Sequence, residues 1–203
     1  MKELEEKNNK LEAKVLLLES RVIISEGVST KLAIELDRLD QYHRRPNIII
    51  KNAPLPENET NNAITTTVND IIEKDLSLPN VVSEIDKFHR VGKVRTRNGK
   101  KHQDIIVRFK THSSRYLVYK ERKKARNVKI SPNLTKRRAT LLYEASNWVK
   151  DLDAVDFVFA NIHGDLNLRL VEPYQEKILF PFSTLDDLKK TLLEMDIIQV
   201  SDI

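Results

Sequence analysis

Residues 44–52 read RRPNIIIKN, and the hydrophobic pattern of the chain changes within this stretch. Pro46 lacks the backbone N–H that a helix interior uses, so Pro46 and the preceding Arg44 and Arg45 predict the end of a helix. The apolar run inside residues 47–52 is continuous, which is typical of a buried strand. The stretch therefore predicts that an N-terminal helix ends here and that a new domain begins.

Before this boundary, apolar residues recur with the seven-residue period of a coiled coil. No proline precedes Pro46, so one helix can extend over about 60 Å. Asn8, Ser25 and Ser29 place polar groups in the seam, which fixes the register near Asn8 and weakens pairing around residues 25–29. The predicted seam consists of Leu4, Leu11, Val15, Leu18, Val22, Leu32, Leu36 and Leu39.

Charged residues flank this seam in a pattern that favours parallel self-association. Basic residues stand on one side and glutamates on the other, so that three attractive pairs meet between neighbouring parallel helices: Lys7 with Glu12, Lys14 with Glu19, and Arg21 with Glu26. Valine at one seam position and leucine at the other suits a dimer as well as a trimer. The alternative is a single amphipathic helix that lies on the following domain.

After the boundary, strand-like and helix-like segments follow one another in the order βαββαβ. They are a strand at residues 47–52, a helical stripe at 64–72, strands at 85–91 and 104–110 around the Asn98-Gly99 turn, a helix from Ser113 or Ser114 to Arg126, and a strand at 128–131. This order predicts a ferredoxin-like domain of the RNA-recognition-motif type at residues 44–132.

Residues 133–203 predict a small α+β C-terminal domain, and residues 1–43 the coiled coil, so the fold class of the chain is α+β. The C-terminal part shows a helical stripe at 141–152, a hairpin of residues 155–160 and 166–171 around Gly164, and a final helix capped by Ser183. It is near the lower size limit for an independent core. We therefore expect it to pack on the preceding domain.

Positive charge is concentrated in one part of the chain. Residues 87–138 contain nineteen Lys and Arg and only two acidic residues, although the net charge of the whole chain is +5. These cations are interleaved with a strand-like and a helix-like segment, so folding gathers many of them on one body. The pattern favours a polyanion as partner, and a merely solvated charged surface is the alternative.

The composition argues against several other classes of protein. The chain has no cysteine and only four glycines, which excludes disulfides and thiolate zinc sites and argues against a phosphate-cradling loop. No GxSxG, HExxH or phosphate-loop motif occurs, and the five histidines lack metal-ligand spacing. No apolar run approaches the roughly 18 residues of a membrane span. We therefore expect a soluble intracellular protein that is not an enzyme and that uses no cofactor, metal or membrane.

These parts, in this order, resemble the first open-reading-frame protein of LINE-type retrotransposons over essentially the whole chain. The resemblance is carried by the segments RRPNIIIKNAP, FHRVG, QDIIVRFKT, ERKKARN, SPNLTKRR and GDLNLRLVEPYQEKILFPFST. It implies a parallel trimeric coiled coil, an RNA-recognition-motif domain and a C-terminal domain, which bind single-stranded nucleic acid with chaperone activity. The family's trimer signal is matched from Arg21 to Glu26 except at Ser25.

The resemblance also implies nucleic-acid contacts at the positions that match the family's pattern. They comprise an arginine pair before the first strand, the arginine closing the second strand, a basic loop, basic residues of the second helix, a basic site opening the last domain, and a hairpin aromatic. In this chain they are Arg44, Arg45, Arg90, Arg95, Arg97, Lys100, Lys101, Arg122, Arg126, Arg137, Arg138 and Phe159. The alternatives are that the arginine pair only ends the helix and that the loop cations are only solvated.

The sheet is expected to lack one feature of ordinary RNA-recognition-motif domains, which stack bases on aromatic residues of their two central strands. Ile49, Asp104 and Ile106 are expected at the equivalent outward positions, and Phe109 in the core. Isoleucine offers no ring, and aspartate repels phosphate. We therefore expect sequence-tolerant binding through phosphate contacts of arginine and lysine.

The sequence thus predicts a chaperone that binds single-stranded RNA, with single-stranded DNA as a further ligand, and coats element RNA as a homotrimer. We expect it in a cytoplasmic ribonucleoprotein, and the nucleus is a further expected location. Because the basic run continues past Pro132, the last two domains are expected to share the RNA in the cleft between them. The alternative function is a coiled-coil structural adaptor, a domesticated or viral relative, with secondary RNA binding.

Overall fold

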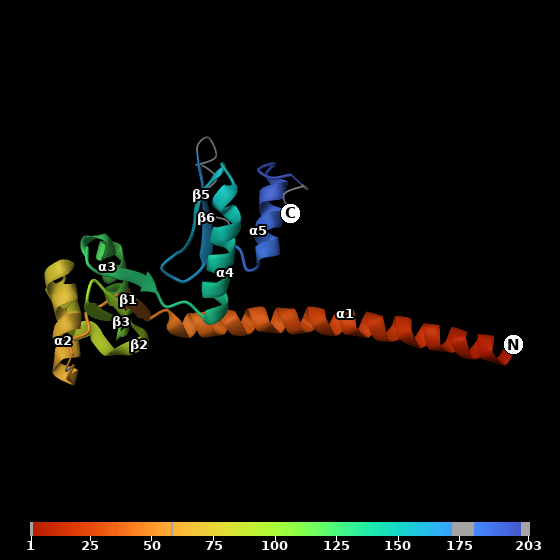
Figure 1. Cartoon of the computed structure of the whole chain (residues 1–203), viewed down its shortest axis with the longest axis horizontal. Helices are drawn as coiled ribbons and strands as arrows, with labels where there is room; N and C mark the ends of the chain where they lie inside the picture. The colour runs from red at the N-terminus through yellow and green to blue at the C-terminus, as the bar shows by residue number, and fades with distance from the viewer. Residues whose placement is uncertain (1, 58, 172–180, 200–203) are drawn as a thin grey trace. The chain divides into compact units, whose positions relative to one another are not determined.

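The computed structural model describes residues 2–57, 59–171 and 181–199 and divides the chain into two compact units, Met1–Leu39 and Asp40–Ile203. A long N-terminal helix precedes a sheet with its helices and a small second sheet (Figure 1). The predicted α+β class is thereby confirmed, together with its N-terminal helix.

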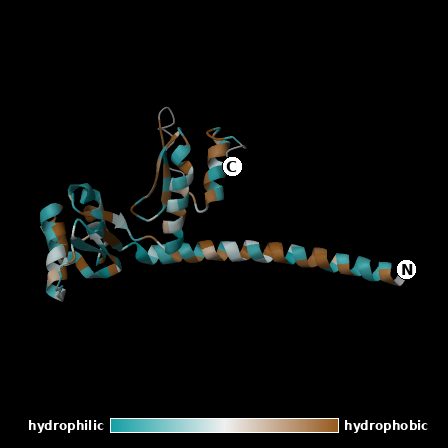
Figure 2. Cartoon of the chain, in the orientation of Figure 1, coloured by the Kyte–Doolittle hydropathy of each residue, from teal (hydrophilic) through white to brown (hydrophobic). Residues whose placement is uncertain are grey.

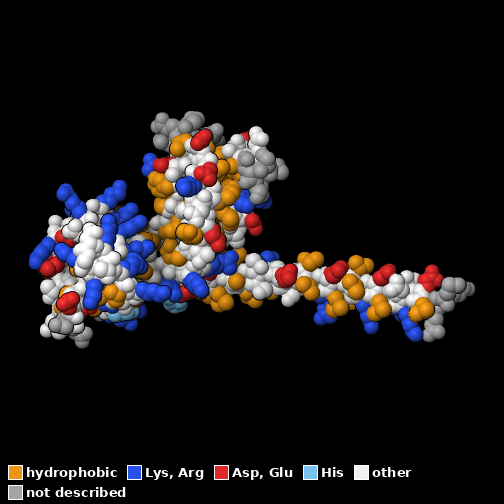
Figure 3. All heavy atoms as spheres, in the orientation of Figure 1, with side chains coloured by type: hydrophobic (Ala, Val, Ile, Leu, Met, Phe, Trp, Pro, Cys, Tyr) orange, Lys and Arg blue, Asp and Glu red, His pale blue; other side chains and the backbone are white. Residues whose placement is uncertain are grey.

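The first unit is made of the helix α1 (Lys2–Arg44), whose last turn belongs to the second unit. The eight seam residues from Leu4 to Leu39 keep 51% to 73% of their surface exposed, and hydrophobic bands run along the helix (Figure 2). Acidic side chains follow one edge of the visible face and basic side chains the opposite edge (Figure 3). Among the described residues of its own unit, the apolar seam therefore has no partner that buries it.

The second unit contains a four-stranded antiparallel sheet. Its strands are β1 (Asn47–Lys51), β2 (Ile85–Arg97), β3 (Lys100–Phe109) and β4 (Lys129–Pro132), in the order β2-β3-β1-β4. Side chains alternate between the two faces of a strand, so Ile48 and Ile50 are buried while Ile49, opposite Ile106, is half-buried on the other face. α1 ends at Arg44 and β1 begins at Asn47, on either side of Pro46, as the sequence predicts.

Helices cover the buried face of this sheet. They are α2 (Asn61–Asp70), which continues as the π-helical turn η1 (Ile71–Asp75), the short η2 (Pro79–Glu84), α3 (His112–Glu121) and η3 (Arg122–Lys124). Val68 and Ile72 from the first of these helices and Val118 from α3 pack in one core with Ile105 and Val107 of β3. This core determines which face of the sheet remains available to a ligand.

The predicted start and end of α3 are wrong. The cap is Thr111, whose hydroxyl accepts a hydrogen bond from the backbone N–H of Ser114 at 3.2 Å, not Ser113 or Ser114. Serine and threonine have the same capping chemistry, so the sequence does not distinguish them. The helix ends at Glu121 and not at the predicted Arg126. The short helix η3 follows it, and Arg126 lies beyond η3.

The rest of the second unit has its own core. It consists of α4 (Lys136–Trp148), η4 (Val149–Asp151), the hairpin β5 (Val155–Ala160) and β6 (Leu166–Leu170), and α5 (Leu185–Glu194). Leu141 of α4, Leu168 of β6 and Leu188 of α5 pack together. α5 is capped by Thr184 rather than by the predicted Ser183. Both cores lie within one compact unit, and the domain boundary after residue 132 stays a prediction.

A helix that crosses a bilayer has to be both long and apolar throughout its length. No helix in the described part of the chain has this combination.

A glycine in the β5–β6 turn closely contacts a buried glutamine. Gly164 has φ +84°, and a Cβ at this position would overlap the amide of Gln41. The Gln41 side chain is buried, donates to the carbonyl of Asn133 at 3.1 Å and accepts from the backbone N–H of Thr135 at 3.0 Å. Gln41 therefore cannot move away without breaking two buried hydrogen bonds.

Replacing Gly164 by alanine is expected to lower the free energy of unfolding by about 2–3 kcal/mol. Two costs add up, because alanine is strained in the left-handed backbone conformation and its Cβ overlaps the Gln41 side chain. Gly99→Ala is the matched control, since Gly99 has φ +73° but nothing near its missing Cβ. The control is expected to lose only the backbone contribution, about 1–2 kcal/mol. Urea denaturation measures both, and equal losses would contradict the proposed overlap with Gln41.

Candidate nucleic-acid interface

Lysine and arginine side chains gather around the four-stranded sheet and its helices (Figure 3). The residues predicted to contact nucleic acid lie on different elements of the second unit. The sequence does not reveal which of their charges are exposed to solvent and which are engaged inside the fold.

The predicted basic loop is in fact part of an extended hairpin, because β2 and β3 continue to the Asn98-Gly99 turn. Arg97 lies opposite Lys100 in the ladder, and Thr96 lies opposite Lys101. All four side chains are exposed. Like charges that face each other across strands repel, so an anion would stabilise this end of the hairpin.

Arg95 differs from its neighbours on the hairpin because it already contacts an acid. Its guanidinium lies 3.4 Å from Asp104 and 3.4 Å from the side-chain oxygen of Asn52. Asp104 also accepts a hydrogen bond from the backbone N–H of Asn52 at 3.0 Å. The acidic residue expected to repel phosphate on the sheet is therefore partly neutralised within the fold.

Arg90 is engaged inside the fold. Its side chain is 9% exposed and forms a two-point ion pair with Glu59, with N–O distances of 2.5 and 3.1 Å. The guanidinium also donates to the backbone carbonyls of Ala53, Pro54 and Gln103. This geometry gives Arg90 the role of tying the segment around residues 53–59 to the hairpin.

The arginine pair after α1 has two different environments. Arg44 pairs with Asp40 at 2.9 Å. Arg45 lies over the ring of Tyr42, with its guanidinium carbon 5.2 Å from the ring centre, and its Nε is buried without a hydrogen-bond partner among the described residues. Arg45 thus has an unused donor.

The end of α3 presents a stacked arginine. The Arg122 guanidinium lies 4.0 Å from the ring centre of Tyr119, and the Tyr119 hydroxyl donates to the carbonyl of Ala160 at 3.3 Å. Arg126 is exposed after η3. Tyr119 was not among the predicted residues, although its position three before Arg122 in a helix places the two on one face.

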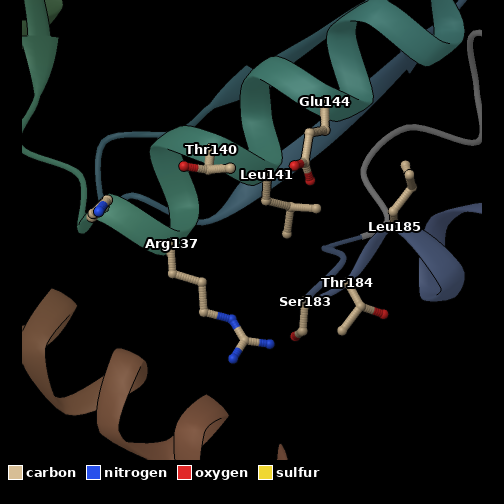
Figure 4. Close-up of a pocket in the computed structure, with 8 residues that line it drawn as sticks. Arg137, Thr140, Leu141, Glu144, Ser183, Thr184 and Leu185 are labelled. Atoms are coloured by element: carbon tan, nitrogen blue, oxygen red, sulfur yellow. The ribbon is translucent and has the colours of Figure 1, made fainter.

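Arg137 and Arg138 open α4 and face different surroundings. Arg138 is bound to Asp165 at 3.1 Å and to the carbonyl of Gly164 at 2.7 Å. Arg137 extends from α4 toward Ser183 across a pocket of about 460 Å³ (Figure 4). Glu144 also lines this pocket, so the pocket contains both positive and negative side chains.

The predicted aromatic residue, Phe159, lies in a second cleft of about 360 Å³. Ile49 from the open face of the sheet, Tyr119 from α3 and Phe159 from β5 all line this cleft, with Lys51 and Lys129 at the strands. The open face thus meets the hairpin of the C-terminal part at a cleft with apolar walls and two cations.

Four residues of the sheet decide whether bases can stack on it. Phe109 is in the core, as predicted. Ile49, Asp104 and Ile106 are half-buried on the strands that form the open face. Phe157 on the small sheet is exposed, and its ring centre lies 5.5 Å from that of Phe159.

One basic residue that the prediction missed is almost fully buried. Arg115 on α3 is 2% exposed, and its guanidinium donates to the carbonyl of Asn47 at 3.2 Å and to that of Ile162. Burial lowers the pKa of Arg115 to about 10, so it remains charged near neutral pH. No motif marks this residue, because its role depends on carbonyls that are far away in the sequence.

No protein-family model and no curated protein matches the chain.

Proposed function

We propose that the chain binds single-stranded RNA, and single-stranded DNA as a further ligand, through a basic surface of the second unit. This surface comprises Arg45, Arg95, Arg97, Lys100, Lys101, Arg122, Arg126 and Arg137. Arg97, Lys100 and Lys101 carry the proposal, because no acidic side chain within the described ranges pairs with them. Clustered cations without partners attract a polyanion and release its counterions on binding.

Two further observations support this proposal. Antiparallel strands in the order β2-β3-β1-β4, with helices on one face, suit a ferredoxin-like domain of the RNA-recognition-motif type. The open face carries isoleucines instead of aromatic residues, which favours phosphate contacts over base stacking on the sheet.

The exposed seam of α1 and its flanking charges support a parallel homotrimer. Together these parts fit a nucleic-acid chaperone of the LINE first open-reading-frame class, which would coat element RNA in a cytoplasmic ribonucleoprotein. Each chain of a trimer would present one basic surface, and several weak phosphate-binding surfaces on one strand act together.

A structural adaptor is the second candidate function. It is favoured by exposed apolar residues outside the seam, Leu16, Leu17, Ile23 and Ile24, which offer a surface to a protein partner. A salt series with a random single-stranded RNA separates the two functions. Tight, salt-sensitive binding is expected of the chaperone, and absence of binding would favour the adaptor.

Arg97→Ala combined with Lys100→Ala is expected to weaken RNA binding almost equally for all sequences. The slope of log affinity against log salt should fall by about 0.7 for each phosphate that the variant no longer neutralises. The pair is preferable to Arg95, whose charge is already shared with Asp104.

The matched control replaces two cations that are paired with acids elsewhere. Lys74 lies 2.8 Å from Asp70, and Lys190 lies 3.7 Å from Glu194. Lys74→Ala with Lys190→Ala should leave the slope unchanged. If the hairpin variant also kept the slope of the unaltered chain, its cations would be solvated and would not contact RNA.

A further inference from the structure

Arg115 brings together basic residues that are far apart in the sequence. Its two backbone acceptors are Asn47, which follows Arg45 by two residues, and Ile162, which directly precedes His163. His112 lies one helical turn before Arg115 on α3. A single buried guanidinium on α3 therefore links the start of β1 to the turn between β5 and β6.

The backbone of His163 is held within the β5–β6 turn. Its backbone N–H donates to the side chain of Asn161 at 2.8 Å. Partial burial of the His163 side chain, helped by Arg45, Arg115 and His112, lowers its pKa, while Asp165 opposes the shift. His163 is therefore mostly neutral near pH 7 in the free protein.

Among the described residues, an acid that acts on His163 is Asp165, and this acid is already engaged. Asp165 lies 3.1 Å from Arg138 and accepts from the side-chain amide of Asn161 at 3.2 Å. Both histidines are exposed, and the Nε of Arg45 lacks a partner among the described residues. The cluster thus combines excess positive charge, an unused donor and access to solvent.

We propose that Arg45, His112, Arg115 and His163 form a phosphate-binding site, occupied by a backbone phosphate of the bound nucleic acid. The inference rests on the proposed function and extends it. The arginines supply permanent charge, and each histidine donates an N–H to a phosphate oxygen when it is protonated. The site would hold the strand where the sheet and the β5–β6 turn meet.

Phosphate at this site couples binding to proton uptake. A nearby anion favours the charged form of a histidine and raises its pKa. Affinity should therefore rise as the pH falls from about 7.5 to 5.5, by at most about ten-fold per pH unit for each histidine that takes up a proton. Arginine and lysine contacts elsewhere keep their charge throughout this range.

The test measures binding of a fluorescent twenty-nucleotide RNA to the full chain at both pH values and constant salt. The unaltered chain is expected to gain at least about ten-fold in affinity at the lower pH. His112→Gln with His163→Gln should lose most of this gain. His89→Gln is the matched control, since His89 is an exposed histidine on β2, and it should retain the gain.

Histidine ring signals in NMR spectra identify the site and the source of the phosphate. The pKa of His163 should rise when the RNA is added. A comparable rise with inorganic phosphate alone would assign the site to free phosphate, which would overturn the backbone assignment. RNA binding whose pH dependence survives in the double variant would overturn the site but leave the proposed function intact, whereas no RNA binding at all would overturn both.

Discussion

A full-length chain in which Leu11 and Leu18 are both replaced by glutamine is expected to be a monomer at tens of micromolar, where we expect the unaltered chain to form the proposed parallel trimer. Each buried leucine contributes about 1.5–3 kcal/mol, and every chain of the assembly loses two. Light scattering coupled to gel filtration measures the mass. The unfolding transition of the second unit should be unchanged, because both leucines belong to the first unit.

The matched control changes two leucines of the same helix outside the seam. Leu16 and Leu17 are 67% and 60% exposed, against 59% and 57% for Leu11 and Leu18. The exposed fractions within one chain therefore do not distinguish the seam leucines from the control leucines. The two double variants differ only if neighbouring helices associate along the predicted seam. Leu16→Gln with Leu17→Gln should leave the mass unchanged. Equal dissociation by both double variants, or a monomeric unaltered chain, would rule out this seam.

The second large effect is expected at the buried ion pair of the second unit. Glu59→Ala leaves the guanidinium of Arg90, 9% exposed, without its carboxylate. Removing one partner of a buried pair costs about 3–5 kcal/mol. Urea denaturation is expected to show a loss of this size in the free energy of unfolding.

An exposed ion pair provides the control for this substitution. Glu194 pairs with Lys190, and their side chains are 65% and 77% exposed. Glu194→Ala should cost less than about 1 kcal/mol. If Glu59→Ala were as mild as the control, the segment around residues 53–59 would not depend on Arg90. A folded Arg90→Lys variant should keep the salt slope of RNA binding, which separates Arg90 from the exposed cations.

The elements that the sequence predicted best are those whose apolar pattern reflects burial. β1 was predicted because its isoleucines lie between Pro46 and a polar end, and the β5–β6 hairpin because Gly164 separates two apolar runs. The hairpin of β2 and β3 was predicted too short. Its outer part, around Arg95 and Lys101, is exposed and polar, so no hydrophobic period marks it as strand.

The environment of individual cations was the least predictable property. Arg90 and Arg97 belong to one basic run, yet Arg90 is paired with Glu59 while Arg97 is exposed. Counting charges along the chain cannot distinguish them, because the partner of Arg90 is brought close by the fold. Arg115 illustrates the same limit, since its acceptors are backbone carbonyls rather than charged side chains.

The facing cations at the end of the β2–β3 hairpin affect more than affinity. Arg97 and Lys100 occupy one rung, and Lys101 lies on the next, so closing the ladder brings positive charges together and raises the electrostatic energy of the free hairpin. Counterions reduce this repulsion in solution, and the phosphates of a bound strand would take their place. The end of the hairpin would then be most rigid when RNA is bound, and its ordering would accompany recognition instead of preceding it.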